Sequence, residues 1–404
     1  MPNLANIKDC TGCQACVNAC PKSAISMKAD SLGFLYPQID SQKCVSCGLC
    51  EKSCPILHKR KDSRQEPDAY AFISKSDRKK SSSGGAFSMF ARYILANGGV
   101  VFGAHIDENL KVFHTYVEKM DDLDLLRGSK YVQSYIGNSY KEAKSFLKQG
   151  RQVLFSGTPC QVAGLYAYLG DNNFDNLLIT LDLVCHGVPN QHTFDSYCKK
   201  LSSEHQDKGR VCRFLFRKLD SWSLISSAKF DKEKKWRILE GAENLYMQMF
   251  FRGWTYRESC LSCPFASIHR PGTFTIADFW GIGRHGSRFK KNIAAGVSLV
   301  LDNKKRMDSL ISKMMVYGYI EKRTLSEAVS ENQNLASHVE RSSNRESAIL
   351  DMQDETLSLK QIALKYNLLS RKKISAKIFM LLRKVIHALG LYNIYKTINY
   401  KLGK

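Results

Sequence analysis

The sequence predicts a protein of mixed α+β and α/β class with several domains. Three observations support this: a cysteine repeat confined to the first 58 residues, a strand–helix–strand pattern after residue 139, and a basic C-terminal stretch with apolar residues at helical spacing. We expect an N-terminal domain at 1–58, a linker at 59–67, an α/β domain with a partly parallel sheet in two parts at 68–140 and 141–330, and a basic helical tail at 331–404.

Eight cysteines form two runs with the same C-x2-C-x2-C-x3-C-P spacing. The first run holds Cys10, Cys13, Cys16 and Cys20, and the second holds Cys44, Cys47, Cys50 and Cys54. In such runs three thiolates bind one 4Fe–4S cluster and the fourth reaches the other cluster. We therefore predict one cluster at Cys10, Cys13, Cys16 and Cys54, and a second at Cys44, Cys47, Cys50 and Cys20.

Two other interpretations of these cysteines are zinc sites and disulfides. Structural zinc sites usually carry paired C-x2-C knuckles, and disulfides require an oxidising compartment. The spacing fits neither as well, and residues 24–27 and 34–36 predict a small hairpin between the runs. Residues 1–58 resemble the bacterial two-cluster ferredoxin.

Composition predicts a globular protein of the cytoplasm. Apolar residues make up 44% of the chain, the N-terminus has no apolar signal core, and no stretch of 18 apolar residues occurs. The net charge is +22, and residues 361–404 contain ten Lys or Arg and no Asp or Glu. Nucleic-acid binding is not expected, because no aromatic residues are interleaved with the basic ones in a recognisable module.

The α/β region opens with a predicted strand at 69–73, a helix at 86–97 and a strand at 100–104. The loop Ser83-Gly84-Gly85 precedes that helix. Free amides at a helix N-terminus suit a phosphate, but the same loop also suits an ordinary helix cap. The residues alone leave both interpretations open.

The clearest unit is a helix from Ser139, with Glu142 completing a capping box, followed by a strand at 152–155, a helix at 160–169 and a strand at 177–184. A crossover of this length favours parallel pairing. Cys160 and Cys185 would then both follow carboxyl ends of strands, where open α/β sheets bind ligands. Further strands are expected near 211–217, 223–230, 273–276 and 297–301.

Six cysteines lie outside the N-terminal runs. Cys198 and Cys212 fall within a predicted helix and strand and are expected to pack in the core. The other four lie in turns: Cys160, Cys185, Cys260 and Cys263. They could form a third metal centre, remain buried thiols, or supply a nucleophile at Cys185 beside His186.

Several separate motifs resemble the beta-subunit family of coenzyme F-420 hydrogenases and dehydrogenases over about residues 68–320. They are Gly128-Ser129-Lys130-Tyr131, the run from Phe155 to Gly164, Cys185-His186-Gly187-Val188-Pro189, Cys260-x-x-Cys263-Pro264-Phe265 and Asp278-Phe279-Trp280-Gly281. The sequence departs from the family at Phe274, where members commonly have an acid, and at Ala277, where they have Gly.

The resemblance implies an α/β flavin-binding domain with FAD and a third 4Fe–4S cluster. The cluster would use Cys160, Cys185, Cys260 and Cys263. The Ser83-Gly84-Gly85 loop would lie near the FAD phosphates, and the rest of the site would be lined by Gly128, Ser129, Lys130, Tyr131, Gly157 and Thr158. No catalytic residue is assigned.

We therefore expect an iron–sulfur flavoprotein oxidoreductase that exchanges electrons with a protein such as ferredoxin and acts on an organic substrate or a deazaflavin. The alternative is an electron-transfer subunit with no organic substrate of its own. The apolar face of a predicted helix at 374–389 would either pack on the fold or lie on the inner face of an anionic membrane.

Overall fold

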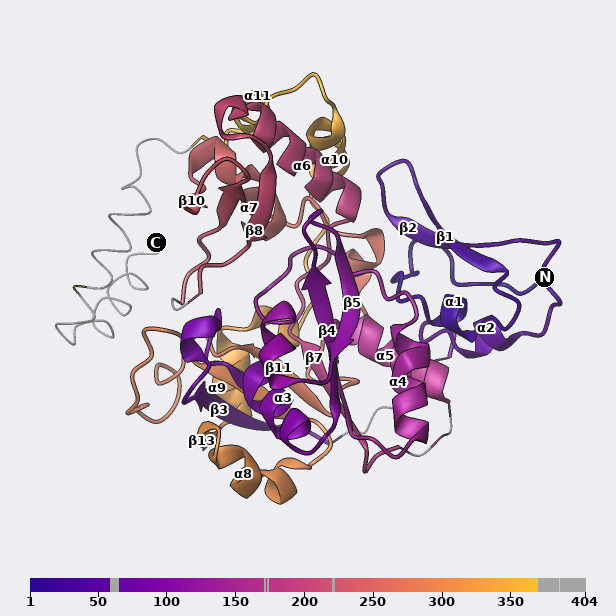
Figure 1. Ribbon diagram of the computed structural model, residues 1–404, viewed down its shortest axis with the longest axis vertical. Coiled ribbons are helices and arrows are strands. Elements are labelled where there is room, and N and C mark those ends of the chain that lie inside the picture. Colours follow the sequence, from indigo (N-terminus) through magenta and orange to yellow (C-terminus); the bar gives the residue numbers. More distant parts are fainter. Residues whose placement is uncertain (59–64, 171, 173, 220–221, 370–384, 386–404) are drawn as a thin grey trace.

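The computed structural model describes residues 1–58, 65–170, 172, 174–219, 222–369 and 385 (Figure 1). Most of the predicted linker lies outside these residues. The predicted helix at 374–389 also lies outside them, apart from Val385.

The N-terminal module, residues 1–58, consists of two short helices and a hairpin: α1 (Ala15–Ala19), β1 (Ile25–Ala29), β2 (Leu35–Ile39) and α2 (Leu49–Lys52). The strands pair antiparallel with Ile25 opposite Ile39, which confirms the predicted hairpin. Figure 1 shows the module projecting from one side of the molecule, with α1 next to α4 and α5 of the larger domain. The module therefore has one side against the α/β domain and one side away from it.

An eight-stranded mixed sheet forms the centre of the larger domain. Its strands are β3 (Asp68–Ser74), β4 (Val100–Ile106), β5 (Val112–Val117), β6 (Val153–Gly157), β7 (Leu178–Leu183), β11 (Phe274–Asp278), β12 (Ser298–Asp302) and β13 (Gly318–Arg323). They are ordered β13-β3-β12-β11-β7-β6-β4-β5. The neighbours β11, β7, β6 and β4 are parallel, and the pairs nearer the edges are antiparallel. The predicted partly parallel sheet is confirmed.

Helices cover both faces of this sheet. Because side chains alternate along a strand, Val101 and Leu154 pack under α3 (Ala86–Ala96) and α8 (Met307–Met315), whereas Val100 and Val153 pack under α4 (Ser139–Lys148) and α5 (Pro159–Leu169). The short helix α9 (Leu325–Ser330) packs beside β3. Because both faces of the sheet are buried, the sequences of the central strands are almost continuously apolar.

The crossover β6–α5–β7 determines where the chemistry-bearing residues lie. Val153 pairs with Leu178 and Gly157 with Asp182 in parallel register, as predicted. Cys160 follows the end of β6, and Cys185 follows the end of β7. The two thiols therefore come from the same edge of the sheet.

A second layer packs beside the central sheet. It contains the antiparallel strands β8 (Val211–Leu215), β9 (Ser227–Phe230) and β10 (Arg237–Ile238), together with α6 (Gln191–Ser203), α7 (Leu245–Phe251), α10 (Arg345–Gln353) and α11 (Leu359–Lys365). These elements share one apolar core that includes Phe194, Tyr246 and Ile362.

One local prediction is wrong. Helix α4 begins at Ser139, but no side chain caps it, and the Ser139 hydroxyl instead donates to the His114 carbonyl at 3.3 Å. The bond ties the helix to β5, so tertiary packing replaces the expected capping box. Among the described residues, no helix has the length and apolar composition needed to cross a membrane.

Candidate functional site

The N-terminal module gathers its eight cysteines around two cavities. Cys10, Cys13, Cys16 and Cys54 line one, and we call them the inner quartet. Cys20, Cys44, Cys47 and Cys50 line the other, and we call them the outer quartet. Each quartet takes its fourth thiol from the other run, which is the exchange that the spacing predicts for two 4Fe–4S clusters.

Left-handed backbone conformations let the chain fold around these cavities. Gln14 (φ 61°) precedes α1 and Gly48 (φ 72°) precedes α2, and both occupy the N-cap position of their helix. At each position the chain turns sharply between the second and third cysteines of a run. The two runs are therefore alike in backbone as well as in spacing.

A third cavity is lined by Cys160, Cys185, Cys260 and Cys263, which we call the third quartet. Cys160 lies in the first turn of α5 and Cys185 lies just after β7. Cys260 belongs to the short 3-10 helix η5 (Glu258–Ser262), and Cys263 follows it. Three separate segments between residues 160 and 263 thus bring four thiols to one edge of the sheet.

Four of the buried thiols, Cys13, Cys16, Cys185 and Cys260, are hard to ionise without a positive partner. Burial is the largest cause and neighbouring thiolates add to it, so that the pKa of Cys16 and that of Cys260 both rise to about 12. Burial likewise raises the pKa of Cys13 and of Cys185 well above the usual value. A bound iron cluster would supply the positive charge that the thiolate forms need. Among the described residues, no group of three or more Cys, His, Asp or Glu side chains is arranged to hold a single metal ion.

The inner and third quartets lie on either side of one wall. Thr11 lines both cavities. A Cβ atom on Gly164 of α5 would lie 3.1 Å from the Cys13 sulfur, so glycine permits the close approach of the module to this helix. The buried Tyr140 hydroxyl lies 3.0 Å from the Cys13 carbonyl and 2.7 Å from the Gln161 carbonyl, which share its hydrogen.

Arg257 ties the module to the domain at the same place. Its guanidinium donates to the carbonyls of Cys10 (3.2 Å) and Leu35, and to the Gln133 side chain (3.0 Å). It also lies 4.4 Å from the centre of the Tyr36 ring, within cation–π distance. This buried cation lowers the pKa of Cys10, Cys160 and Cys260 and so opposes the effect of burial.

The two segments proposed for flavin lie side by side. The hydroxyls of Ser82 and Ser129 are 3.2 Å apart, and Ser83 donates to the Val297 carbonyl at 3.1 Å. The loop that carries Ser83, Gly84 and Gly85 therefore meets the segment that carries Gly128, Ser129, Lys130 and Tyr131.

Gly84 and Gly85 each have a structural reason to be glycine. A Cβ atom on Gly84 would overlap the Phe72 carbonyl and the Ser298 amide, because the loop packs onto β3 and β12. Gly85 has a φ of 90°. Close packing alone accounts for both residues, so their identity does not decide between a helix cap and a phosphate loop.

Lys130 is a cation without a carboxylate partner among the described residues. Its amine donates to the carbonyls of Leu126 (3.0 Å) and Arg127 (2.8 Å), and burial lowers its pKa to about 7. Tyr131 instead packs its ring on Phe250, with ring centres 4.6 Å apart. Lys130 is therefore the group in this segment that gains most from an arriving anion.

Gly157 and Thr158 lie at the end of β6, beside the third quartet. The Thr158 hydroxyl is 3.2 Å from the Cys160 sulfur. His114 lies between this turn and the segment that carries Lys130. Its ring forms a hydrogen bond with the Ser156 carbonyl at 2.9 Å. Burial is the main cause that lowers the pKa of His114, and the charge of the nearby Lys130 lowers it further. The predicted flavin residues thus extend from the Ser82–Gly85 loop toward the third quartet.

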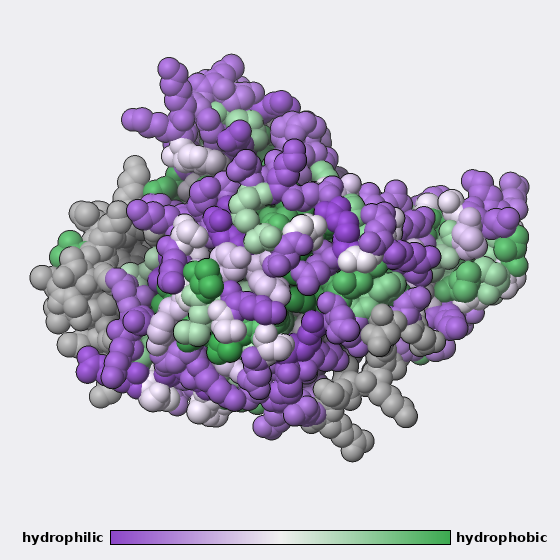
Figure 2. Space-filling model, turned by 60° about the horizontal axis from the view of Figure 1, so that its bottom comes forward, coloured by the Kyte–Doolittle hydropathy of each residue, from purple (hydrophilic) through white to green (hydrophobic). Residues whose placement is uncertain are grey.

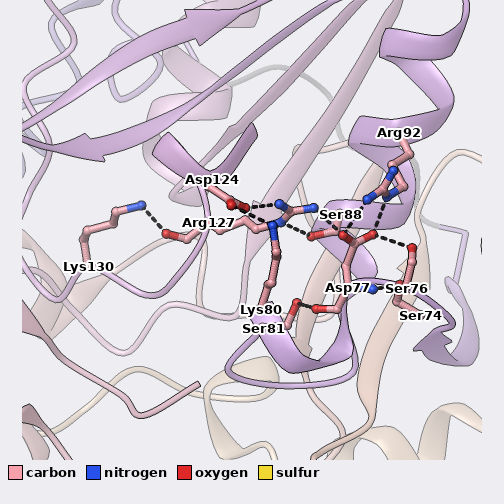
Figure 3. A network of polar contacts seen from close by, with 10 residues as sticks. All are labelled: Ser74, Ser76, Asp77, Lys80, Ser81, Ser88, Arg92, Asp124, Arg127 and Lys130. Carbon is pink, nitrogen blue, oxygen red and sulfur yellow. Dashed lines mark hydrogen bonds and ion pairs between the residues drawn. The ribbon is translucent and has the colours of Figure 1, made fainter. Parts of the chain in front are cut away.

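A buried ionic network supports both segments (Figure 3). Asp77 is fully buried and pairs with Arg92 and Arg127, while the Ser81 hydroxyl donates to the Asp77 carbonyl at 2.8 Å. The backbone of Arg127 in turn accepts the bond from Lys130. Burial raises the pKa of Asp77, but the bond from Arg92 and the charge of Arg127 outweigh it, and the net shift is downward.

Sequence reasoning missed Arg217 and Arg257, since a lone arginine carries no motif. Arg217 pairs with Asp278 at 2.5 Å and donates to the Ser82 carbonyl at 3.0 Å. Asp278 also accepts from Trp222 at 2.7 Å, and the Trp222 and Trp280 rings stack 4.8 Å apart. Of these residues, the sequence motif Asp278-Phe279-Trp280-Gly281 had pointed to Asp278 and Trp280.

Comparisons with known proteins match two regions of the chain to family models. Residues 9–56 match the model described as 4Fe-4S dicluster domain, and residues 150–328 match the model that describes the C terminus of the Coenzyme F420 hydrogenase/dehydrogenase beta subunit. In a structural comparison, a chain of the F420-reducing [NiFe] hydrogenase complex from Methanosarcina barkeri aligns with a TM-score of 0.46 and 13% identity, covering 68% of this chain and 92% of that one.

Curated relatives match the N-terminal module. The ketoisovalerate oxidoreductase subunit VorC of Methanothermobacter marburgensis is 33% identical over 57 residues, which are 14% of this chain and 72% of VorC. The ferredoxin-type protein NapF of Escherichia coli K12 is 39% identical over 44 residues, or 11% of this chain; the match spans only 27% of NapF. With its dicluster domain at residues 9–56 the chain is an iron–sulfur protein, and its residues 150–328 match the family of coenzyme F420 hydrogenase/dehydrogenase beta subunits.

Proposed function

We propose that the protein is an iron–sulfur flavoprotein oxidoreductase with three 4Fe–4S clusters and one FAD. Electrons would pass between the outer quartet, the inner quartet, the third quartet and the flavin, and the substrate would be an organic compound or a deazaflavin. The single observation that carries the proposal is the wall shared by the inner and third cavities, with Thr11 on both sides. Because of this shared wall, the third quartet is next to the inner quartet, and a cluster there would extend the electron path of the module into the domain.

Bound clusters would carry single electrons, and a bound flavin would exchange them in pairs with an organic molecule. The residues of the chain hold these groups in line. Arg257, Gln133 and Tyr140 fix the Cys10–Cys13 backbone against the domain. Thr158 and Cys160, which are neighbours in the turn after β6, join the third quartet to the proposed flavin segments.

An iron cluster in the third quartet fits this arrangement better than zinc or free thiols. Zinc has no redox chemistry and would end the path at the shared wall. Four free thiols with raised pKa values in one cavity would have no role that requires their convergence. A nucleophilic role for Cys185 is also disfavoured, because burial keeps its thiol protonated.

The cations near the two flavin segments suit the phosphates of FAD. Helix α3 presents its N-terminus directly after Gly85. Arg217 is already paired with Asp278, whereas Lys130 is held only by backbone carbonyls among the described residues. A phosphate beside Lys130 would favour its charged form and be bound by it.

The test is anaerobic reconstitution followed by cofactor analysis. We expect about twelve iron atoms and one FAD per chain. Eight iron atoms in fully loaded protein would contradict the third cluster. Full iron content without FAD would favour the electron-transfer subunit that lacks an organic substrate of its own.

A matched pair of variants tests the flavin site separately. Lys130→Met should lower FAD retention and leave the iron content unchanged, because it removes the cation without touching a thiol. Lys119→Met, at an exposed lysine, serves as the control. Equal FAD content in the two variants would count against Lys130 as the phosphate partner.

A further inference from the structure

The outer quartet lies nearest to solvent of the three thiol clusters. Cys47 is exposed, whereas the other eleven predicted cluster ligands are buried or partly buried. Helix α2, which carries Cys50, packs on α1, and α1 packs on α4 and α5. The outer quartet is therefore separated from the α/β domain by the rest of the module, and Figure 1 shows α2 on the outer side of α1. A protein that exchanges electrons with the chain would approach most closely here.

Apolar side chains surround this opening. Val45 is 59% exposed and Leu49 is 45% exposed, and both are next to cluster ligands in the sequence. Pro2 and Pro21 line the same cavity. Figure 2 shows a group of hydrophobic residues on the outer end of the projecting module, bordered by hydrophilic ones. Small apolar contacts with a polar rim are typical of transient electron-transfer interfaces.

The charged residues of the rim are mainly basic. Lys22, Lys43 and Lys52 are exposed. Lys43 pairs with Asp40 at 3.2 Å, but Lys22 and Lys52 form no ion pair with a described acidic residue. The nearby Glu51 is partly buried and accepts a bond from the Asn3 amide. With a chain net charge of +22, this rim should attract an acidic protein.

We propose that this outer face, formed by Pro2, Pro21, Lys22, Lys43, Val45, Cys47, Leu49 and Lys52, docks an acidic one-electron carrier protein. The proposal rests on the proposed function in one respect, since it requires a cluster in the outer quartet. In each encounter a reduced carrier loses one electron and the oxidised cluster of the outer quartet gains it. The basic rim accelerates the encounter, and the apolar residues hold the two clusters close during transfer.

The test measures electron transfer from a purified, acidic two-cluster bacterial ferredoxin by anaerobic stopped flow at several salt concentrations. The variant carries Lys22→Glu and Lys52→Glu. The control carries Lys234→Glu and Lys235→Glu, which make the same change in net charge at exposed positions between β9 and β10. We expect the wild-type second-order rate constant to fall as salt rises, because salt screens the attraction.

At low salt the outer-face variant should react about ten-fold more slowly than wild type, with a weaker salt dependence, and the control should stay within about two-fold of wild type. Equal losses in both variants would overturn the proposal, since net charge alone would then govern the rate. A wild-type rate that rises with salt would overturn it as well, because the carrier site would then be acidic.

Photoreduction by deazariboflavin, which needs no docking surface, separates this test from the proposed function. Both variants should photoreduce as wild type does and should keep the wild-type iron and FAD content. If iron or FAD is deficient in wild type as well, the proposed function fails instead. A further variant, Val45→Asp, should slow electron transfer from the ferredoxin but not photoreduction. An unchanged rate of transfer would show that Val45 does not contact the carrier.

Discussion

The N-terminal module surrounds two cavities with four cysteines each, and the α/β domain surrounds one, but the two regions bring their cysteines together in different ways. In the module, all eight cysteines lie within 45 residues of sequence, and left-handed turns at Gln14 and Gly48 bring each run around its cavity. In the domain, Cys160, Cys185 and Cys260 come from three segments joined by a sheet. Local spacing builds the first two sites, and tertiary topology builds the third.

This difference determines what each site depends on. A module site needs its own loops and little else, because the residues that line both cavities belong to residues 1–58. The third site needs β6 and β7 in parallel register, with η5 placed over their carboxyl ends. Damage to the fold of the domain should therefore affect the third site before the other two.

The largest expected effect comes from removing one thiol of the third quartet. Cys260→Ala should lower the iron content by about a third and leave the module clusters intact, since the three sites share no cysteine. Iron analysis with electron paramagnetic resonance measures this loss. Cys198→Ala, at a buried cysteine outside all quartets, is the control and should keep full iron.

Loss of all iron from Cys260→Ala would contradict the independence of the two regions, because cluster binding in the module would then depend on the domain. Full iron in the same variant would show that the third quartet does not hold a cluster. The reciprocal variant Cys47→Ala should lose only the outer cluster.

Sequence patterns predicted the features that have a local signal. The two cysteine runs, the hairpin between them and the β6–α5–β7 crossover each show a spacing or a periodicity, and the structure has all of them at the expected positions. The third quartet could be suggested only as four turn cysteines, because its members are far apart in sequence.

Residues that act through tertiary contact gave no signal. Arg217 lies in a basic stretch without a motif, yet it meets Ser82 and Asp278 from other parts of the chain. Arg257 and Gly164 owe their roles to the module packed against them. The prediction of a Ser139 capping box was wrong for the same reason. The Ser139 hydroxyl donates to the carbonyl of His114 on a strand and does not cap the helix.

A second prediction concerns a substitution that should destabilise the domain without removing a cysteine. Asp77→Asn should lower the free energy of unfolding of the domain by about 3 kcal/mol, because Arg92 and Arg127 lose a buried carboxylate. In a denaturant titration followed by visible absorbance, FAD and the third cluster should be released before the module clusters. Asp124→Asn, at an exposed partner of Arg127, should cost at most about 1 kcal/mol.

The same variant has a defined pH dependence. The folded pKa of Asp77 lies below its ordinary value of 3.8, so the carboxylate stabilises the fold above that pH and the stabilisation is lost as pH falls through the folded pKa. The stability difference between wild type and Asp77→Asn should therefore be full at neutral pH and shrink in acid below about pH 4. A constant difference down to pH 3 would show that the carboxylate charge is not the cause.

A smaller effect is expected where the two regions meet. Arg257→Gln should lower the free energy of unfolding by about 2 kcal/mol, since the shorter neutral side chain cannot reach the Cys10 and Leu35 carbonyls together. Chemical denaturation of the loaded protein measures the loss. Arg341→Gln, at a half-exposed arginine paired with Glu258, should cost less than half as much. Equal costs would mean that Arg257 does not join the module to the domain.

The smallest effect tests how closely the module approaches α5. In an isolated helix, Gly164→Ala would stabilise by up to about 1 kcal/mol. Here the added methyl would lie 2.9 Å from the Tyr140 hydroxyl oxygen and 3.1 Å from the Cys13 sulfur, and such overpacking costs about 1–3 kcal/mol. We therefore expect a net loss of about 1 kcal/mol, with a shifted electron paramagnetic resonance signal from the inner cluster alone. Gly103→Ala, whose methyl meets no atom nearer than 3.6 Å, should leave that signal unchanged. A stabilised Gly164→Ala protein with an unchanged signal would mean that the module lies farther from the third site than a direct path between the clusters requires.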